Sequence, residues 1–353
     1  MAKFVLKNLI IIFILTALTG CSFLGLRIGG ENKKIANFTD KENIGGVLKS
    51  INKGETFKFK NQITAKESIN RLDIKALLFD PQDTLTLYLL SKNKGLWVTY
   101  NGAESWEILL NELINAVALD HQKRGLIYAA KDTVLLKTED GGSSWETIFI
   151  ETLGNVITAL ANDPQDSNHL LAAAQNGLIF ETVDQGESWR LLANLKVKAL
   201  RHIIINPQNS AEIYAATATE GIFKSQDKGR NWSPLSNLEK FPGSYEYGQL
   251  KLNPVNPDHL YLACKYGILK SEDSGEHWQP LSLLTPRGQT KILTVGFNYF
   301  DERMIYYATK DSFFRSGDRG QTWSFSSLPT SRYPIEILVD DFDTNVVYIA
   351  VSN

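Results

Sequence analysis

Five nine-residue segments of this chain align with one another without a gap. They are KTEDGGSSW, ETVDQGESW, KSQDKGRNW, KSEDSGEHW and RSGDRGQTW. Their last residues are Trp145, Trp189, Trp232, Trp278 and Trp323, so the repeat period is 43 to 46 residues. A weaker copy, VTYNGAESW, ends 39 residues before the first of these. A nearly fixed period of this length indicates an array of one repeated supersecondary unit.

Each segment follows a stereotyped run, such as ALANDPQDSNHLLAAAQNGLIFETVDQGESW. The run predicts a strand, an Asp-Pro turn, a second strand, a Gly-containing turn and a third strand. A polar turn and a fourth strand, opened by the tryptophan, complete the unit. Four short strands in 40–45 residues are typical of one blade of a β-propeller, so the sequence predicts an all-β chain.

The repeated pattern Ser/Thr-x-Asp-x-Gly-x-x-Trp resembles the Asp-box, also called the bacterial neuraminidase (BNR) repeat. In such a turn the carboxylate can accept backbone N–H groups, and the glycine supplies angles that other residues resist. The tryptophan buries apolar area between sheets. A row of catalytic or calcium-binding aspartates is the alternative, but similar boxes occur in proteins of unrelated activity, which favours a structural role. The predicted structural positions are Ser50, Asn52, Gly54, Phe57, Thr99, Asn101, Trp106, Thr138, Asp140, Gly142, Trp145, Thr182, Asp184, Gly186, Trp189, Ser225, Asp227, Gly229, Trp232, Ser271, Asp273, Gly275, Trp278, Ser316, Asp318, Gly320 and Trp323.

The two ends of the repeat array are each incomplete. The stretch NIGGVLKSINKGETFKFK, residues 43–60, contains a degenerate box but lacks the two strands that should precede it. The C-terminal run IEILVDDFDTNVVYIAVSN supplies two strands and no box. Joined, the two ends make one repeat. We therefore predict a seven-bladed β-propeller whose seventh blade is closed by both termini, which leaves no open edge in the ring.

The first 20 residues have the order of a secretory signal peptide, with two lysines, an apolar run and small residues. The ending Leu-Thr-Gly-Cys resembles a lipobox, which implies that Cys21 carries lipid and attaches the protein to a membrane. An ordinary signal with an incidental cysteine is the alternative. Residues 21–42 are then a flexible tether and residues 43–353 the propeller. The expected location is extracytoplasmic, on a bacterial membrane facing the periplasm or the cell surface.

The overall charge of the chain is nearly balanced. The formal net charge is −2, and loss of the signal peptide would remove two lysines and no acidic residue. Nucleic acid is therefore not an expected partner. The second cysteine, Cys264, lies in an apolar strand-like run and is expected to be a buried thiol.

The loops of a propeller divide between two faces. We call the face with the strand 1–2 turns and the boxes the box face, and its uniform turns indicate a scaffold. The other face carries the 2–3 and 4–1 connections; we call it the variable face and expect a specific site there. Arginine and tyrosine favour interface anchors, although a solvated rim of scattered lysines is the alternative. The predicted binding residues are Lys196, Lys198, Arg201, Tyr245, Tyr247, Arg287, Lys291, Arg332 and Tyr333.

No catalytic constellation, metal site or cofactor is predicted from the sequence. The five histidines are dispersed, which does not suit metal ligation. Two-carboxylate glycoside hydrolysis needs acids that face each other across a cleft, and the sequence leaves open whether Glu112 and Glu246 do so.

The chain as a whole resembles single-propeller proteins of the photosystem II stability/assembly-factor type and the sortilin type. That resemblance implies a scaffold that binds a protein partner, which can be an integral membrane protein. The alternative is a carbohydrate-binding protein or glycoside hydrolase of the sialidase or xyloglucanase type. In that case Trp97, Tyr245, Tyr247 and Tyr333 would be sugar platforms.

Overall fold

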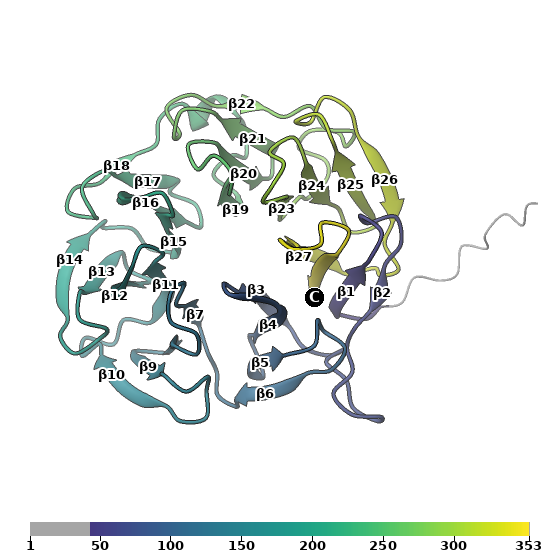
Figure 1. Cartoon of the computed structure of the whole chain (residues 1–353). Coiled ribbons are helices and arrows are strands. Elements are labelled where there is room, and N and C mark those ends of the chain that lie inside the picture. The colour runs from purple at the N-terminus through teal and green to yellow at the C-terminus, as the bar shows by residue number, and fades with distance from the viewer. Residues whose placement is uncertain (1–42, 353) are drawn as a thin grey trace, which may run out of the picture. The chain divides into compact units, whose positions relative to one another are not determined.

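The computed structural model describes residues 43–352, which form seven four-stranded antiparallel sheets arranged in a ring (Figure 1). Within blade 4, for example, β15 lies nearest the centre of the ring and β18 lies at the rim (Figure 1). The predicted seven-bladed all-β propeller is confirmed. The predicted signal peptide, the lipidated Cys21 and the tether lie outside the described residues.

The blades follow one another along the chain. Blade 1 contains β3 (Ile74–Asp80), β4 (Asp83–Ser91), β5 (Gly95–Thr99) and β6 (Glu107–Leu110). Blade 2 contains β7 (Ala116–Leu119), β8 (Ile127–Lys131), β9 (Val134–Thr138) and β10 (Glu146–Ile150). Blade 3 contains β11 (Ile157–Asp163), β12 (Asp166–Ala174), β13 (Leu178–Thr182) and β14 (Arg190–Asn194). Blade 4 contains β15 (Leu200–Asn206), β16 (Asn209–Thr217), β17 (Ile222–Ser225) and β18 (Ser233–Pro234).

Blades 5 to 7 complete the ring. Blade 5 contains β19 (Tyr247–Leu252), β20 (Leu260–Cys264), β21 (Gly267–Ser271) and β22 (Gln279–Pro280), and a 3-10 turn, η1 (Leu238–Lys240), precedes it. Blade 6 contains β23 (Val295–Phe297), β24 (Ile305–Ala308), β25 (Ser312–Ser316) and β26 (Ser324–Ser327). Blade 7 contains β27 (Tyr333–Val339), β28 (Val347–Ser352), β1 (Gly46–Ser50) and β2 (Lys58–Phe59).

Both ends of the chain build blade 7, as predicted. The strand order of its sheet is β2-β1-β28-β27, and β1 pairs antiparallel with β28 from Gly46↔Val351 to Ser50↔Val347. The degenerate box also binds blade 6, because Ser326 Oγ donates to the Gly54 carbonyl oxygen at 2.5 Å. The N-terminal strands therefore close the ring through ladder hydrogen bonds and side-chain contacts.

The apolar core lies between adjacent blades rather than at the centre of the ring. One cluster joins Leu77 and Leu87 of blade 1 to Tyr348 and Ala350 of blade 7. Each fully buried leucine of this kind contributes about 1.5–3 kcal/mol to the stability of the fold. The centre of the ring is thereby left to side chains of the innermost strands.

The boxes are closed turns, and blade 3 illustrates their geometry. Thr182 Oγ1 donates to Asp184 Oδ1 at 2.6 Å, and Gly186 N–H donates back to Thr182 Oγ1 at 2.9 Å. Ser188 donates through both its N–H and its hydroxyl group to Asp184, and these bonds lower the pKa of that aspartate to about 2. The Asp184 carboxylate therefore forms its hydrogen bonds within the turn.

The box tryptophans are less uniform than the pattern predicts. Trp106 and Trp278 are buried, whereas the tryptophans of blades 2, 3, 4 and 6 are half-buried. Burial between sheets is thus complete in two blades only.

A second repeated turn ends the innermost strand of every blade. An Asp or Asn side chain accepts the backbone N–H two residues later, as in an Asx turn. The residues are Asp80, Asp120, Asp163, Asn206, Asn253, Asn298 and Asp340.

A third repeated feature pairs a tyrosine of the second strand with a cation of the third. The register pairs Tyr214 with Lys224 and Tyr261 with Lys270, and each ammonium group lies over its ring, at 5.7 and 5.9 Å from the centroid. The same register positions pair Tyr128 with Lys137, Tyr306 with Arg315, and Tyr348 with Lys49. These lysines carry their charge inside the blade because an aromatic face and nearby acceptors hold it.

Candidate interaction face

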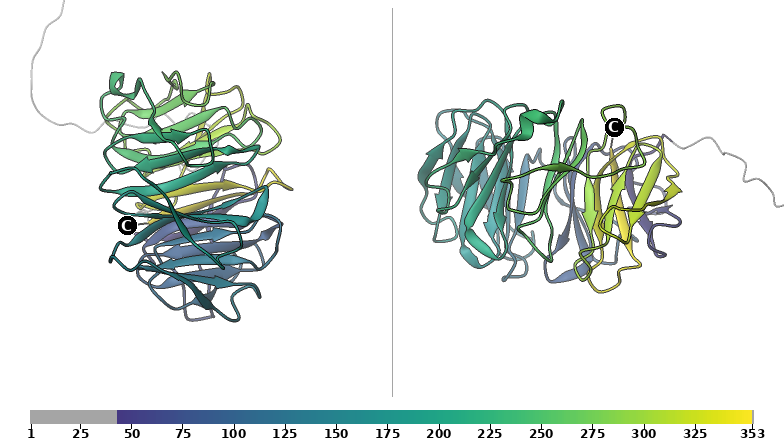
Figure 2. Two further views of the ribbon diagram at one scale, coloured as in Figure 1. Left: turned by 90° about the vertical axis from the view of Figure 1, so that its left-hand side faces the viewer. Right: turned by 90° about the horizontal axis from the view of Figure 1, so that it is seen from above.

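The 2–3 and 4–1 connections lie together on one side of the ring, and the right-hand view of Figure 2 shows the ring edge-on with its loops above and below. The longest of them are the segment 60–73, the segment 235–246, which includes η1, and the segment 281–294. They lead into the inner strands of blades 1, 5 and 6. The variable face is therefore most elaborate where blade 7 passes into blade 1 and over blades 5 and 6.

Carboxylates on this face are largely engaged. Lys131 pairs with Glu112, Lys265 Nζ lies 2.7 Å from Glu246 Oε1, and Lys92 Nζ lies 3.3 Å from an oxygen of Asp73. Other acids are used by the backbone. Glu220 accepts the N–H of Lys198, and Glu151 accepts the N–H groups of its own loop.

The basic groups on the same face outnumber these partners. Within residues 43–352, none of the following forms an ion pair: Lys75, Lys94, Lys196, Lys198, Arg201, Arg287, Lys291, Lys310 and Arg332. All of them except Arg332 are exposed. The face therefore presents an excess of positive charge that the described residues do not neutralise.

Two lysines of blade 6 gather around one tyrosine. Lys291 Nζ lies 5.4 Å and Lys310 Nζ 5.5 Å from the ring centroid of Tyr333. A tyrosine ring attracts cations through its π-face, so it can hold two like charges closer together than their repulsion alone would favour. The pair offers two ammonium groups to one ligand anion.

A second group of aromatic and basic side chains on this face contains Phe241, Tyr266 and Arg287. Phe241 of the 235–246 segment packs edge-on against Tyr266, with centroids 5.3 Å apart. Arg287 lies over the same Tyr266 ring at 5.7 Å and donates to its hydroxyl oxygen at 3.5 Å. The guanidinium group is thereby positioned while its other N–H donors remain available.

Arg201 belongs to a different environment, at the inner strand of blade 4. It occupies a bulge of β15, because Leu200 pairs with Thr217 and His202 with Ala216. Lys75 occupies the corresponding bulge of β3, between Ile74 and Ala76. Desolvation of its ammonium group, which donates to the Asn115 carbonyl oxygen, together with the charges of Lys92 and Arg201, lowers the pKa of Lys75 although part of the side chain is exposed.

Beside Arg201, the half-buried Tyr247 forms a hydrogen bond with His202. Tyr247 Oη accepts the N–H of Leu250 at 3.0 Å and shares a hydrogen bond with His202 Nδ1 at 2.6 Å. Burial, with the nearby charges of Lys75 and Arg201, lowers the pKa of His202 to about 4. The imidazole is therefore neutral at physiological pH.

Two inner strands that are not neighbours in the ring are joined across blade 6. Glu336 of β27 accepts from Gln249 Nε2 at 2.8 Å and from the ammonium group of Lys251, both on β19. Lys251 Nζ also donates to the Ile337 carbonyl oxygen at 3.2 Å. The inner strand of blade 6, β23, has only three residues, which leaves room for this contact.

The structure places the predicted binding residues in three groups. Lys291 lies over Tyr333, Arg287 lies over Tyr266, and Tyr245 packs over Gly221 of the neighbouring blade. Lys196 and Lys198 stand apart on the connection between blades 3 and 4.

Two of the predicted residues differ in role from the expectation. Tyr247 begins β19 instead of lying in a loop, and its hydroxyl group is engaged with His202. Arg332 donates to the Asn43 carbonyl oxygen at 3.3 Å, which ties it to the N-terminal entry of the propeller.

The structure removes Trp97 from the sugar-platform alternative, whereas Tyr245 is exposed. Trp97 is buried at 8 % exposure and donates its Nε1–H to the Lys94 carbonyl oxygen at 2.9 Å, so its assignment as a platform is wrong. Tyr333 is covered by two lysines, and Glu112 and Glu246 each pair with a lysine of their own face. Residues 43–352 contain no group of three His, Cys, Asp or Glu residues that could hold a metal ion.

Sequence reasoning missed the Tyr–Lys register pairs and the link between Glu336 and β19. The pairs had a signal, because Lys or Arg precedes the Ser or Thr of five boxes. The contact between Glu336 and β19 had no signal in the sequence, since it depends on the short inner strand of blade 6.

Comparison with known proteins supports the relationship that the boxes indicate. Residues 177–284 match the family model "Sortilin, neurotensin receptor 3" (Sortilin-Vps10). YCF48 from Cyanidioschyzon merolae has the same fold at a TM-score of 0.62 and 15% identity, over 79% of this chain and 95% of that one. The structure of YCF48 bound to D1 peptide has a TM-score of 0.63 and 18% sequence identity, and the match covers 83% of this chain and 98% of that one. The chain is similar to the sortilin-type and YCF48-type propellers.

GH74 enzymes share the fold as well. The GH74 xyloglucanase from Xanthomonas campestris gives a TM-score of 0.63 and 18% identity, over 80% of this chain and 51% of that one. The GH74 enzyme from Niastella koreensis has a TM-score of 0.67 and 16% sequence identity, and the match covers 88% of this chain and 53% of that one. The chain spans about half the length of these enzymes. No curated protein sequence matches it.

Proposed function

We propose that this protein is an extracytoplasmic scaffold that binds a protein partner through its variable face and is held to a membrane by lipid on Cys21. The observation that carries the proposal is the uncompensated positive charge over blades 4 to 7. Basic groups there lack carboxylate partners, while Glu112 and Glu246 are paired with lysines and Glu220 accepts a backbone N–H. A partner that supplies carboxylates would complete these contacts, and such complementarity gives specificity and fast association.

The anchors are suited to a protein ligand. Arg287 lies over Tyr266, and Lys291 and Lys310 both lie over Tyr333, so each of these cationic groups is held against an aromatic ring. Arginine and tyrosine are the residue types that carry much of the binding energy in protein interfaces. YCF48, a propeller similar in fold, is known in complex with a D1 peptide. That precedent supports a polypeptide ligand for the present chain.

The membrane part of the proposal rests on the sequence. The lipobox-like ending before Cys21 would provide the anchor. Within residues 43–352 no helix is long and apolar enough to cross a bilayer. An added lipid is thus the proposed means of attachment, and metabolic labelling with a radioactive or clickable fatty acid tests it. Label on the wild type and none on Cys21→Ser would support the anchor, whereas equal labelling would exclude it.

A cross-linking pull-down from native membranes tests the binding face. The test variant carries Arg201→Glu, Arg287→Glu and Lys291→Glu, three exposed residues with no ion pair in the described chain. The matched control carries Lys123→Glu, Lys228→Glu and Arg230→Glu, which are exposed on the box face. We expect one discrete partner with the wild type and the control, and its loss with the test variant. Equal recovery with both variants would refute the assignment of the site.

A further inference from the structure

The turns that follow the inner strands differ in a systematic way around the ring. In blades 1 to 4 the residue two positions after the Asx-turn side chain is glutamine. Three of these glutamines donate from Nε2 to a carbonyl oxygen of the next blade: Gln82 to His121, Gln122 to Pro164 and Gln165 to Pro207, at 3.0 to 3.3 Å. Their role is to tie neighbouring turns together on the box face.

Blades 5 to 7 carry apolar residues at the same position. Val255, Phe300 and Phe342 replace the glutamine, and their side chains are 40%, 72% and 82% exposed. Ile51, in the box of blade 7, is 73% exposed. These blades give up an inter-blade hydrogen bond and present a large apolar side chain to solvent instead. Apolar groups gathered on a surface in this way mark an interaction site.

Two hollows lie beside these residues and share Lys53 and Met304. The smaller, of about 210 Å³, is lined by Phe300 of blade 6 and by Thr344 of the turn that carries Phe342. The larger, of about 520 Å³, extends to Trp323 and Arg315. The hollows therefore connect the turn of blade 6, the turn of blade 7 and the N-terminal box into one surface.

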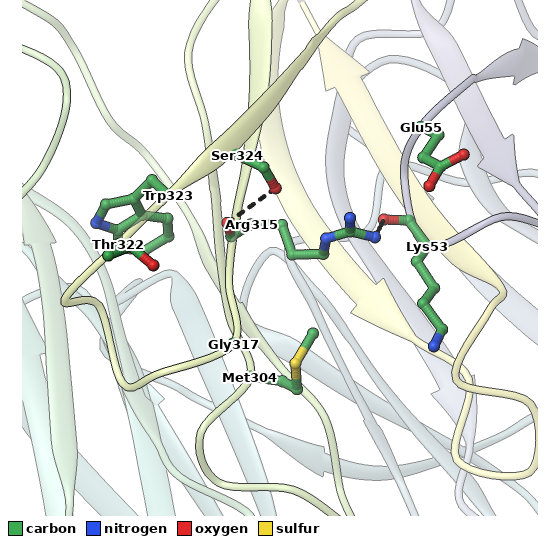
Figure 3. Close-up of a pocket in the computed structure, with 8 residues that line it drawn as sticks. All are labelled: Lys53, Glu55, Met304, Arg315, Gly317, Thr322, Trp323 and Ser324. Carbon is green, nitrogen blue, oxygen red and sulfur yellow. Dashed lines mark hydrogen bonds between the residues drawn. The ribbon is translucent and has the colours of Figure 1, made fainter.

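Figure 3 shows how the basic groups of the larger hollow are arranged. Arg315 points toward the box of blade 7 and donates to the Lys53 carbonyl oxygen at 3.0 Å (Figure 3). The Lys53 ammonium group extends away from that contact, and it forms no ion pair with any residue from 43 to 352. In contrast, Arg303 is paired with Asp301 at 2.8 Å and Arg319 with Glu302. Lys53 thus has no ion pair among residues 43–352, in a lining that holds Phe300 and Met304 together with the carboxylates of Glu55 and Asp301.

We propose that the surface formed by Ile51, Lys53, Phe300, Met304 and Phe342, here called the blade 6–7 patch, binds a segment of another protein that carries apolar side chains next to a carboxylate. The hollows can receive side chains, and the carboxylate would pair with Lys53. A lipid surface fits less well, because attraction to anionic lipid relies on clusters of basic residues. This surface lies on the box face, so the proposal is independent of partner binding at the variable face.

Selection of a random peptide library displayed on phage, with the full-length protein as bait, tests the proposal. We expect enriched peptides in which aromatic or large aliphatic residues flank Asp or Glu. A synthetic peptide of that consensus should lose about ten-fold or more in affinity when Phe300→Gln and Phe342→Gln are combined, since burial of aromatic anchors dominates such contacts. The glutamines restore the residue that blades 1 to 4 carry at this turn, so the fold should tolerate them. Lys53→Glu should give a similar loss.

The matched control is Leu113→Gln with Leu153→Gln, which removes two exposed apolar residues from the variable face, 63% and 79% exposed. It should bind the peptide like the wild type. No enrichment of the expected peptides, or equal binding by all variants, would overturn the proposal. So would loss of liposome binding or of self-association on Phe300→Gln and Phe342→Gln without any peptide binding, because the patch would then serve a lipid surface or a second copy.

Discussion

Replacement of Glu336 by glutamine should destabilise the propeller, because it leaves the Lys251 ammonium group without its carboxylate. The side chains of Glu336 and Lys251 are only 12% and 21% exposed. Removal of one member of a fully buried pair costs about 3–5 kcal/mol, whereas exposed pairs contribute about 0–1 kcal/mol. At this partial exposure, and with the bond from Gln249 kept, we expect a loss of about 2 kcal/mol.

Urea unfolding followed by tryptophan fluorescence measures this loss. The matched comparison is Glu246→Gln, which breaks a pair with Lys265 whose side chains are 59% and 56% exposed. We expect a change below about 1 kcal/mol there. A Lys251→Met and Glu336→Leu double variant should recover much of the stability, since no unpaired charge remains. Equal small effects of Glu336→Gln and Glu246→Gln would refute the idea that the β19–β27 link stabilises the ring.

Three further outcomes follow from local geometry. Gly320→Ala should lower the stability of the propeller more than Gly288→Ala. Both glycines have positive φ, but only at Gly320 would the new Cβ lie 2.6 Å from a Leu281 methyl group. Thermal unfolding of the two variants measures the difference. His202 has a lowered folded pKa of about 4, so the unfolded chain binds its proton first, and stability should fall as pH drops from about 6.5 to 4. His202→Gln should remove that part of the pH slope in acid unfolding curves. Cys264 is buried with its pKa raised to about 11, so a thiol reagent at pH 8 should label it only in denaturant. Peptide mapping separates it from Cys21, and label on Cys264 in the folded protein would contradict this.

The blade count and the closure of the ring could be predicted because they depend on local, repeated signals. Each box fixes a turn by hydrogen bonds within a few residues, as Thr182 and Asp184 show. The missing half-repeat at each end then determines which strands meet. The burial of Cys264 followed in the same way from its apolar strand, and the structure confirms it.

Contacts between distant blades could not be predicted in this way. The bonds from Glu336 to Gln249 and Lys251 join strands 85 to 87 residues apart, and nothing local in the sequence marks them. The uniform box face expected from the repeated turns is also only partly correct. Phe300 and Phe342 interrupt it, and their exposure became evident only from the three-dimensional arrangement. The repeats predict the strands and turns of each blade well. Surfaces specific to this protein arise where a single blade carries residues that differ from the repeat pattern.

Site-specific photo-crosslinking tests the assignment of the variable face most directly. A photoreactive amino acid would replace Arg287 in one variant and Arg230, on the box face of blade 4, in another, each in native membranes. We expect a discrete protein adduct from position 287 and none from position 230. Adducts from position 230 alone, or no adduct from position 287, would contradict the proposal that the variable face binds the partner.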